Sequence, residues 1–214
     1  EEQIVDEVFI SIAKRYKTPI LVSRLSTSLL ISRISNCLSS HFSQKVRVHG
    51  VFLDVKGVGV LIIGKSGIGK SEAALELVNK GNHLISDDLT EFFLNSNEEP
   101  IGRSIDKIKN WIEVRGLGII NVVDIFGNGV VIDEKKLDLV INLEEWSPKK
   151  VYDRLGEENL FYNILDKDIP MFVIPVSLGR NISFLIEIAV KYYIARRNGS
   201  ISFLDNYYRE TIDG

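Results

Sequence analysis

Hydrophobic positions near the start of the chain recur at helical spacing. Over residues 1–20, apolar side chains such as Val8 and Ile12 lie four positions apart. This spacing predicts a helix of about four turns, and it ends at Pro19, because proline disfavours helix in the residue before it. Apolar residues recur at similar intervals over 23–43, which predicts a second helix.

The pattern changes after Gln44, where runs of β-branched residues alternate with glycine turns and helical stretches. We therefore place a domain boundary between residues 44 and 45, giving domains 1–44 and 45–214. The later part alternates strands with helices, which is typical of the α/β class. The expected strands are 46–55, 58–64, 83–86, 89–94, 112–115, 118–123 and 137–143, and the expected helices are 71–80, closed by Gly81, and 181–199.

Composition and charge narrow the function classes. The 214 residues are 45% hydrophobic and 26% charged, as in a globular protein with a sizeable core. The chain has 26 basic and 29 acidic residues, so it has no excess of positive charge that would favour nucleic acid binding. No apolar run reaches the roughly 18 residues that a membrane span requires. The one cysteine, Cys37, permits no internal disulfide, and the three histidines do not have zinc-ligand spacing, so we expect a cytoplasmic protein.

The clearest chemical motif is GKSGIGKS, which matches the phosphate-loop pattern GxxxxGK[ST] between an apolar strand and a helix. In such a loop, backbone N–H groups surround a phosphate, the lysine reaches its oxygens and the serine hydroxyl binds Mg²⁺. The helix that follows adds a dipole that favours anions. The predicted nucleotide-binding residues are Gly64, Lys65, Ser66, Gly67, Ile68, Gly69, Lys70 and Ser71.

Two adjacent carboxylates, Asp87 and Asp88, end the strand that follows the phosphate-loop helix. Ligands of open α/β sheets bind at the carboxyl ends of strands. Neighbouring side chains on a strand point in different directions, so one carboxylate can organise a metal while the other acts as general base. A solvated turn or a helix cap is the alternative interpretation.

The remaining candidate residues are weaker, and most of them have structural alternatives. Glu113 and Arg115 share one face of a predicted strand, which is compatible with a functional segment or with a surface salt-bridge strand. A lone histidine such as His49 is more often a structural residue than a catalytic one, and Arg154 could be an anion clamp or part of a helix-end ion pair. Arg180 precedes a predicted helix start, where it could bind an anion together with the helix N-terminus.

Taken together, the segments VHG, GKSGIGKSE, DD, EVRGLGIIN, DRLG and PVSLGRN resemble HPr kinase/phosphorylase over essentially the whole chain. The resemblance implies a phosphate-loop kinase domain similar to phosphoenolpyruvate carboxykinase over 45–214. Residues 1–44 would be a short α/β remnant of an N-terminal domain with its linker. The implied enzyme phosphorylates a serine of the phosphocarrier HPr with ATP or pyrophosphate, and removes the phosphoryl group with inorganic phosphate to give pyrophosphate. It would need Mg²⁺ or Mn²⁺, form a homohexamer, and regulate carbon metabolism and sugar uptake.

The resemblance also implies roles for individual residues. Lys70 contacts the phosphates, Ser71 and Glu113 bind the metal, and Asp88, beside Asp87, exchanges the proton. His49 and Arg154 match active-site positions. The segment implied to serve both reactions comprises Ile112, Glu113, Val114, Arg115, Gly116, Leu117, Gly118, Ile119, Ile120 and Asn121, and the segment implied for dephosphorylation comprises Pro175, Val176, Ser177, Leu178, Gly179 and Arg180.

Two departures from the family pattern concern charge. Lys65 stands where the family usually has an acid, and Ser177 replaces a usual basic residue, which weakens the expectation of phosphorylase activity more than that of kinase activity. A nucleotide-hydrolysing switch is disfavoured, because the DxxG sequence at 124–127 has no NKxD-type partner. A non-catalytic nucleotide-sensing module is the other alternative, and the intact Asp88 argues against it.

Overall fold

The computed structural model describes residues 5–105, 109–150, 152, 160–177 and 179–199. The chain divides into two compact units, Glu1–Phe42 and Ser43–Gly214. This division lies two residues before the boundary predicted from the sequence. In the described part of the chain, no helix combines the length and apolar character that crossing a membrane would require.

The first unit contains helices α1 (Glu7–Tyr16) and α2 (Thr27–Phe42). The Asp6 side chain accepts a hydrogen bond from the backbone N–H of Val8 and caps α1, which is shorter than predicted. The helix ends at Lys17, which adopts the left-handed conformation. Residues 5–42 contain no strand, so the α/β character expected for this remnant is wrong for its described part.

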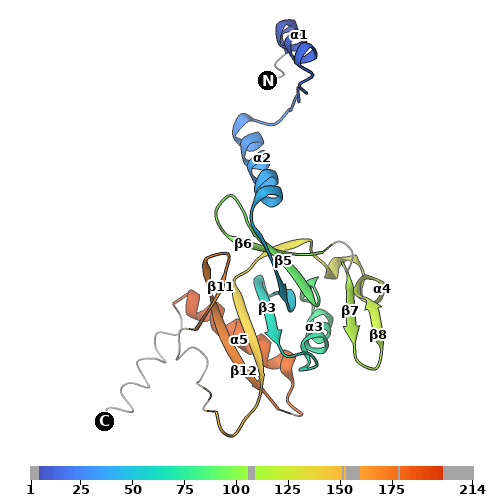
Figure 1. Cartoon of the computed structure of the whole chain (residues 1–214). Coiled ribbons are helices and arrows are strands. Elements are labelled where there is room, and N and C mark those ends of the chain that lie inside the picture. Colours follow the sequence, from blue (N-terminus) through green and yellow to red (C-terminus); the bar gives the residue numbers. More distant parts are fainter. Residues whose placement is uncertain (1–4, 106–108, 151, 153–159, 178, 200–214) are drawn as a thin grey trace, which may run out of the picture. The chain divides into compact units, whose positions relative to one another are not determined.

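A six-stranded mixed sheet forms the centre of the second unit, with the order β11-β12-β10-β3-β2-β4. Figure 1 shows β3, β11 and β12 of this sheet. Strands β3, β10 and β12 are parallel, while β2 runs antiparallel to both β3 and β4. Strand β3, with the sequence VGVLIIG, is an almost continuous apolar run because both of its faces are buried. Their bounds are β2 (Val51–Val55), β3 (Val58–Gly64), β4 (His83–Ser86), β10 (Leu139–Glu145), β11 (Leu160–Ile164) and β12 (Lys167–Val176).

A four-stranded antiparallel sheet and a hairpin complete the strands. The antiparallel sheet has the order β1-β5-β6-β9, formed by β1 (Lys45–His49), β5 (Leu89–Leu94), β6 (Pro100–Ser104) and β9 (Glu134–Lys136). The separate hairpin comprises β7 (Trp111–Val114) and β8 (Gly118–Asn121). It is followed by the short helix α4 (Val122–Phe126) and the 3₁₀ turn η2 (Asn128–Val130).

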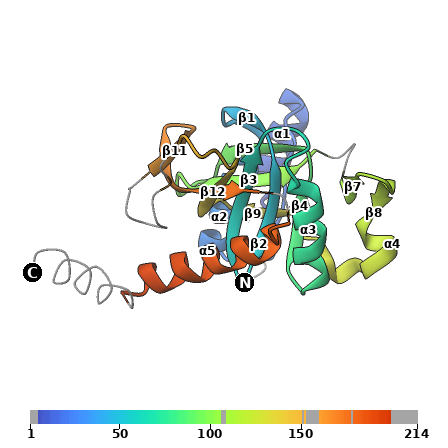
Figure 2. The ribbon, with the colours of Figure 1, turned by 90° about the horizontal axis from the view of Figure 1, so that it is seen from below.

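Hydrophobic packing arranges these elements in three layers. Helices α3 (Lys70–Asn79) and α5 (Ile182–Arg197) lie on one face of the six-stranded sheet (Figure 2), where Leu77 and Ile186 join the core. The antiparallel sheet covers the opposite face, where Phe92 of β5 packs edge-on against Phe52 of β2 with ring centroids 5.3 Å apart. Because both faces are covered, the strand ends at the sheet edge are the accessible places for polar chemistry.

Most predicted elements are present, and the differences have local causes. The strand expected over 46–55 is divided at Gly50 between two sheets, and a Cβ there would lie 2.6 Å from the Ile62 carbonyl oxygen. The hairpin of β11 and β12 was not predicted. Its strand signal is weakened by prolines in β12, and its turn residues, Leu165 and Asp166, have positive φ without being glycine.

Gly59 provides a test of the packing of the central sheet. A Cβ at this position would lie 1.8 Å from the backbone oxygen of Lys136. We therefore expect Gly59→Ala to lower the free energy of unfolding by about 3 kcal/mol or more, because backbone cannot move aside as a side chain does. Gly129→Ala is the matched control, since nothing lies within 4 Å of its added Cβ. Urea denaturation of both variants measures the difference, and equal stabilities would contradict the packing.

Candidate phosphate-binding active site

The phosphate loop joins β3 to α3, and its glycines adopt conformations that other residues avoid. Gly64, Gly67 and Gly69 have φ of 147°, 78° and 103°. A Cβ on Gly64 would lie 2.6 Å from the Leu143 carbonyl oxygen of β10. Helix α3 begins directly after Gly69, and no side chain caps its first turn. Its N-terminal N–H groups are therefore available to an anion.

Lys70 folds back over the loop that precedes it. Its ammonium donates hydrogen bonds to the carbonyl oxygens of Gly64, at 3.0 Å, and of Lys65, at 2.9 Å. These bonds hold the charge across the loop where a bound phosphate would lie. The Lys65 side chain instead forms an exposed ion pair with Glu145, 3.4 Å away.

Asp87 connects three elements around the loop. Its carboxylate accepts hydrogen bonds from the Ser71 hydroxyl, at 3.0 and 3.3 Å, and from the backbone N–H of Glu113, at 3.2 Å. The residue is only 5% exposed. Burial raises the pKa of Asp87, and the hydrogen bonds from Glu113 and Ser71 oppose that rise.

The topology that brings Asp87 to the loop differs from a simple strand–helix–strand unit. Strand β2 lies between β3 and β4, so β4 is not the neighbour of the strand that enters the loop. Because β2 is antiparallel to both, β3 and β4 point the same way and end at the same sheet edge. The carboxyl end of β4, with Asp87 and Asp88, therefore lies at the same sheet edge as the phosphate loop, as expected from the sequence.

Asp88 faces solvent beside His49. The side chains are 81% and 80% exposed, and His49 Nδ1 lies 3.6 Å from Asp88 Oδ1. Asp88 has a φ of 63°, and its carbonyl accepts a hydrogen bond from the backbone N–H of Gly50, at 2.9 Å. The adjacent carboxylates thus have different environments, with Asp87 buried against the loop and Asp88 open to an incoming group.

A cleft of about 220 Å³ brings together residues of the phosphate loop, the carboxylate pair and the β7–β8 hairpin, nine of which were predicted from the sequence. Arg115 lies against the loop, since a Cβ on Gly67 would approach its guanidinium within 2.5 Å. Val51 and Glu72 also line the cleft and were not predicted from the sequence, although Glu72 directly follows the phosphate-loop motif. The lining residues are Val51, Ser66, Gly67, Gly69, Lys70, Ser71, Glu72, Asp87, Asp88, Glu113 and Arg115.

The donor set of the cleft suits a metal that arrives with a nucleotide. Within the described residues, no three histidine, cysteine or acidic side chains are grouped to hold a metal by themselves. Mg²⁺ typically uses one or two protein ligands together with substrate phosphates and water. Ser71 and Glu113 both line the cleft and could serve as those ligands.

The segment implied in dephosphorylation leads from β12 to α5. Pro175 and Val176 end β12, and the Arg180 N–H donates to the Ser177 carbonyl oxygen at 3.2 Å. Arg180 is exposed and does not line the cleft. Two predicted site residues, Arg154 and Leu178, lie outside the described residues.

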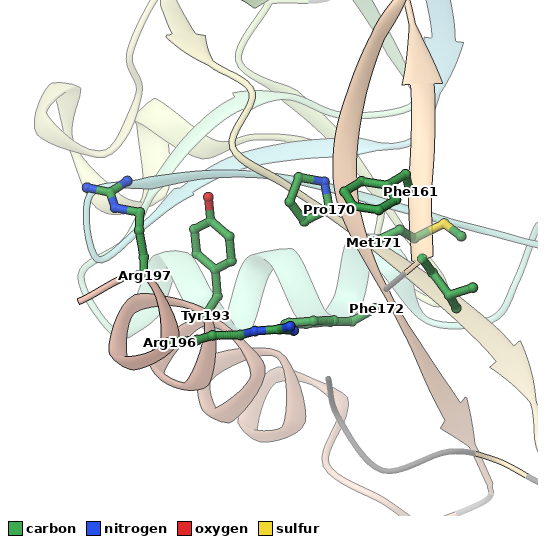
Figure 3. Close-up of a pocket in the computed structure, with 8 residues that line it drawn as sticks. Phe161, Pro170, Met171, Phe172, Tyr193, Arg196 and Arg197 are labelled. Atoms are coloured by element: carbon green, nitrogen blue, oxygen red, sulfur yellow. The ribbon is translucent and has the colours of Figure 1, made fainter. Parts of the chain in front are cut away.

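A second cavity, of about 340 Å³, lies between the β11–β12 hairpin and the end of α5 (Figure 3). It is lined mainly by aromatic and aliphatic side chains, with two arginines, and no predicted site residue contributes to it. The phosphate-loop cleft is therefore the better candidate for the active site. The lining residues are Leu160, Phe161, Pro170, Met171, Phe172, Tyr193, Arg196 and Arg197.

The raised pKa of Asp87 predicts a pH-dependent stability difference. As pH rises above 3.8, the folded chain retains a proton that the unfolded chain has lost, so this residue lowers stability through that interval. Asp87→Asn keeps an acceptor oxygen but cannot ionise. We expect the variant's free energy of unfolding, minus that of the unmodified chain, to increase from pH 4 upward. Urea denaturation across pH 4–8 measures it, and a decreasing difference would mean that hydrogen bonding outweighs burial.

The chain is similar to known proteins over most of its length. Residues 40–208 match the model of the HPr Serine kinase C-terminal domain. The HPr kinase/phosphorylase of Geobacillus thermodenitrificans is 45% identical over 89% of this chain and 62% of its own length, and that of Treponema pallidum is 43% identical over 92% and 62%. The chain thus spans about six-tenths of these relatives.

A solved structure extends the similarity to three dimensions. The HPr(Ser) kinase/phosphatase from Coxiella burnetii aligns with a TM-score of 0.66 and 30% sequence identity, covering 75% of this chain and 97% of that one. The family match covers the phosphate loop, both carboxylates and the segment before α5. On these grounds, the chain belongs to the HPr serine kinase C-terminal domain family.

Proposed function

We propose that this chain is the catalytic part of a bifunctional HPr kinase/phosphorylase that helps to regulate carbon metabolism and sugar uptake. The observation that carries the proposal is the Ser71–Asp87 hydrogen bond, which joins the phosphate loop to the carboxylate pair in one cleft. Together with the family membership, this arrangement supports transfer of a phosphoryl group to a protein serine, with ATP or pyrophosphate as donor.

In the kinase direction, the loop N–H groups and Lys70 hold the donor phosphates. Mg²⁺, or Mn²⁺ in its place, would be held by Ser71 and Glu113 and would neutralise charge on the phosphates. Asp88 accepts the proton of the serine hydroxyl as the serine oxygen bonds to phosphorus and the bond to the leaving phosphate oxygen breaks. The exposure of Asp88 supports this role, because the acceptor is a side chain of another protein.

In the reverse direction, an oxygen of inorganic phosphate attacks the phosphoserine phosphorus. The new bond gives pyrophosphate, and Asp88 returns its proton to the departing serine oxygen. His49 lies beside Asp88 and can hold that carboxylate in place. We assign Arg180, with the segment that precedes it, to holding the attacking phosphate, since a second anion requires a further cation.

Two broader features belong to the same proposal. We assign residues 1–44 to the end of an N-terminal domain with its linker, which agrees with a family match that begins at residue 40. We also propose a homohexamer, as the family resemblance implies. Light scattering of the purified chain measures the mass of the assembly.

Lys70 provides the direct test of the proposed function. The chain is incubated with HPr, ATP and Mg²⁺, and phosphate is then added to phosphorylated HPr. We expect phosphoserine in the first step and pyrophosphate in the second, both abolished by Lys70→Ala because Lys70 stabilises the same transferring group in each direction. Lys191→Ala, an exposed position on α5, should retain both activities. An active Lys70→Ala variant would overturn the assignment.

Substitutions of Asp87 and Asp88 distinguish the general base from the residue that organises the metal ligand Ser71. Asp88→Asn should slow HPr phosphorylation by about 10²–10⁴-fold, because the amide cannot accept the proton. Steady-state kinetics should show this loss in kcat, with a nearly unchanged KM for ATP. Asp87→Asn serves as the comparison, and we expect it to raise the Mg²⁺ requirement through Ser71. A loss of base function in Asp87→Asn alone would reverse the two roles.

A further inference from the structure

The start of helix α5 rests directly on the phosphate loop. Ile182, the first residue of α5, approaches Gly69 so closely that a Cβ on this glycine would lie 2.8 Å from Ile182 Cδ1. Gly69 is also where the loop passes into α3. The last residue of the proposed dephosphorylation segment, Arg180, is two positions before this contact. A small shift of α5 would therefore change where Arg180 stands relative to a bound phosphate.

A buried hydroxyl fixes this end of α5 to α3. Ser183 is fully buried, and its Oγ lies 2.6 Å from Glu76 Oε2 of α3. Lys80, which follows α3, donates to the same Oγ at 3.0 Å and to Glu187 Oε2 of α5 at 3.1 Å. The hydroxyl thus accepts from an ammonium and donates to a carboxylate, which makes both hydrogen bonds charge-assisted.

Asn181 extends these contacts to the segment before the helix. Its Oδ1 accepts the backbone N–H of Phe184, at 2.9 Å, as the N-cap of α5, and also lies 2.9 Å from Ser183 Oγ. Arg180 is covalently attached to this capping residue. We call the group the Ser183 cluster, comprising Glu76, Lys80, Asn181, Ser183 and Glu187, and none of its members lines the phosphate-loop cleft.

We propose that Ser183 is a positioning residue for phosphorolysis, an inference that rests on the proposed function. It fixes the start of α5 against the helix that begins at the phosphate loop, and so sets the distance from Arg180 to the attacking phosphate. The kinase direction depends less on this distance, because its donor phosphates are held by the loop, Lys70 and the metal. Misplacement by about 1 Å can cost about 10²-fold in rate, so the effect is measurable.

The first experiment compares both directions in Ser183→Ala. We expect phosphorolysis of phosphorylated HPr to fall by at least about tenfold, with a raised KM for phosphate, while phosphorylation falls by less than about threefold. Ser183→Thr retains a hydroxyl and should restore most of the phosphorolysis. Ile186→Val is the control, because it removes a buried methyl group from α5 outside the Ser183 cluster. It should leave the ratio of the two activities unchanged.

A double variant tests whether Ser183 acts through Arg180. If it does, adding Ser183→Ala to Arg180→Ala should cause almost no further loss of phosphorolysis, because the positioned group is already absent. Fully additive losses would overturn the proposal, as would parallel losses of both activities in Ser183→Ala. A changed activity ratio in Ile186→Val would also overturn it. An unmodified chain that never phosphorylates HPr would overturn the proposed function itself, a result distinct from these.

Discussion

The buried carboxylate of Asp87 is the interaction on which the site depends. It lies at the end of β4 and accepts hydrogen bonds from Ser71 at the start of α3 and from the backbone of Glu113 in the β7–β8 hairpin. Hydrogen bonds to a charged group contribute about 1.5–3 kcal/mol each, which offsets part of the cost of taking the carboxylate out of water. A side chain that would be unfavourable alone therefore holds the phosphate loop, the carboxylate pair and the hairpin in one arrangement.

Close backbone packing supplies the second constraint. The phosphate loop presses on β10 at Gly64, on Arg115 at Gly67 and on α5 at Gly69, and a side chain at any of these positions would collide with its neighbour. The loop is consequently enclosed on several sides by elements distant in sequence. Such enclosure restricts the backbone of the loop, and a preorganised backbone suits electrostatic stabilisation of a transferring phosphoryl group.

The two departures from the family pattern, Lys65 and Ser177, differ in how their charge is balanced in this structure. The Lys65 side chain pairs with Glu145, so its positive charge is partly compensated in this structure. Both side chains are well exposed, and such a pair contributes little to stability. Lys65 can therefore exchange this partner for a phosphate at small cost. The neutral side chain of Ser177 cannot replace the positive charge that the family pattern has at this position. Within the described part of the segment 175–180, Arg180 is therefore the cation.

Much of this protein follows from local sequence signals. The spacing of GKSGIGKS, the apolar run of β3 and the strand ending in Asp87 and Asp88 predicted a phosphate loop with carboxylates at a shared sheet edge. Each of these features occupies a short stretch of sequence. Its backbone conformation and its chemistry depend on residues within that stretch, so a local motif can predict it. The resemblance of six motifs also identified the family that the later comparison confirmed.

Tertiary structure decided how the remaining residues meet. The insertion of β2 between β3 and β4, the burial of Asp87 against exposed Asp88, and the anchoring of Ser183 to Glu76 could not be predicted from spacing. Each depends on contacts between segments that are far apart in the chain. Strand order and burial follow from the packing of whole faces, and a local pattern specifies that a face is apolar without specifying which face will cover it.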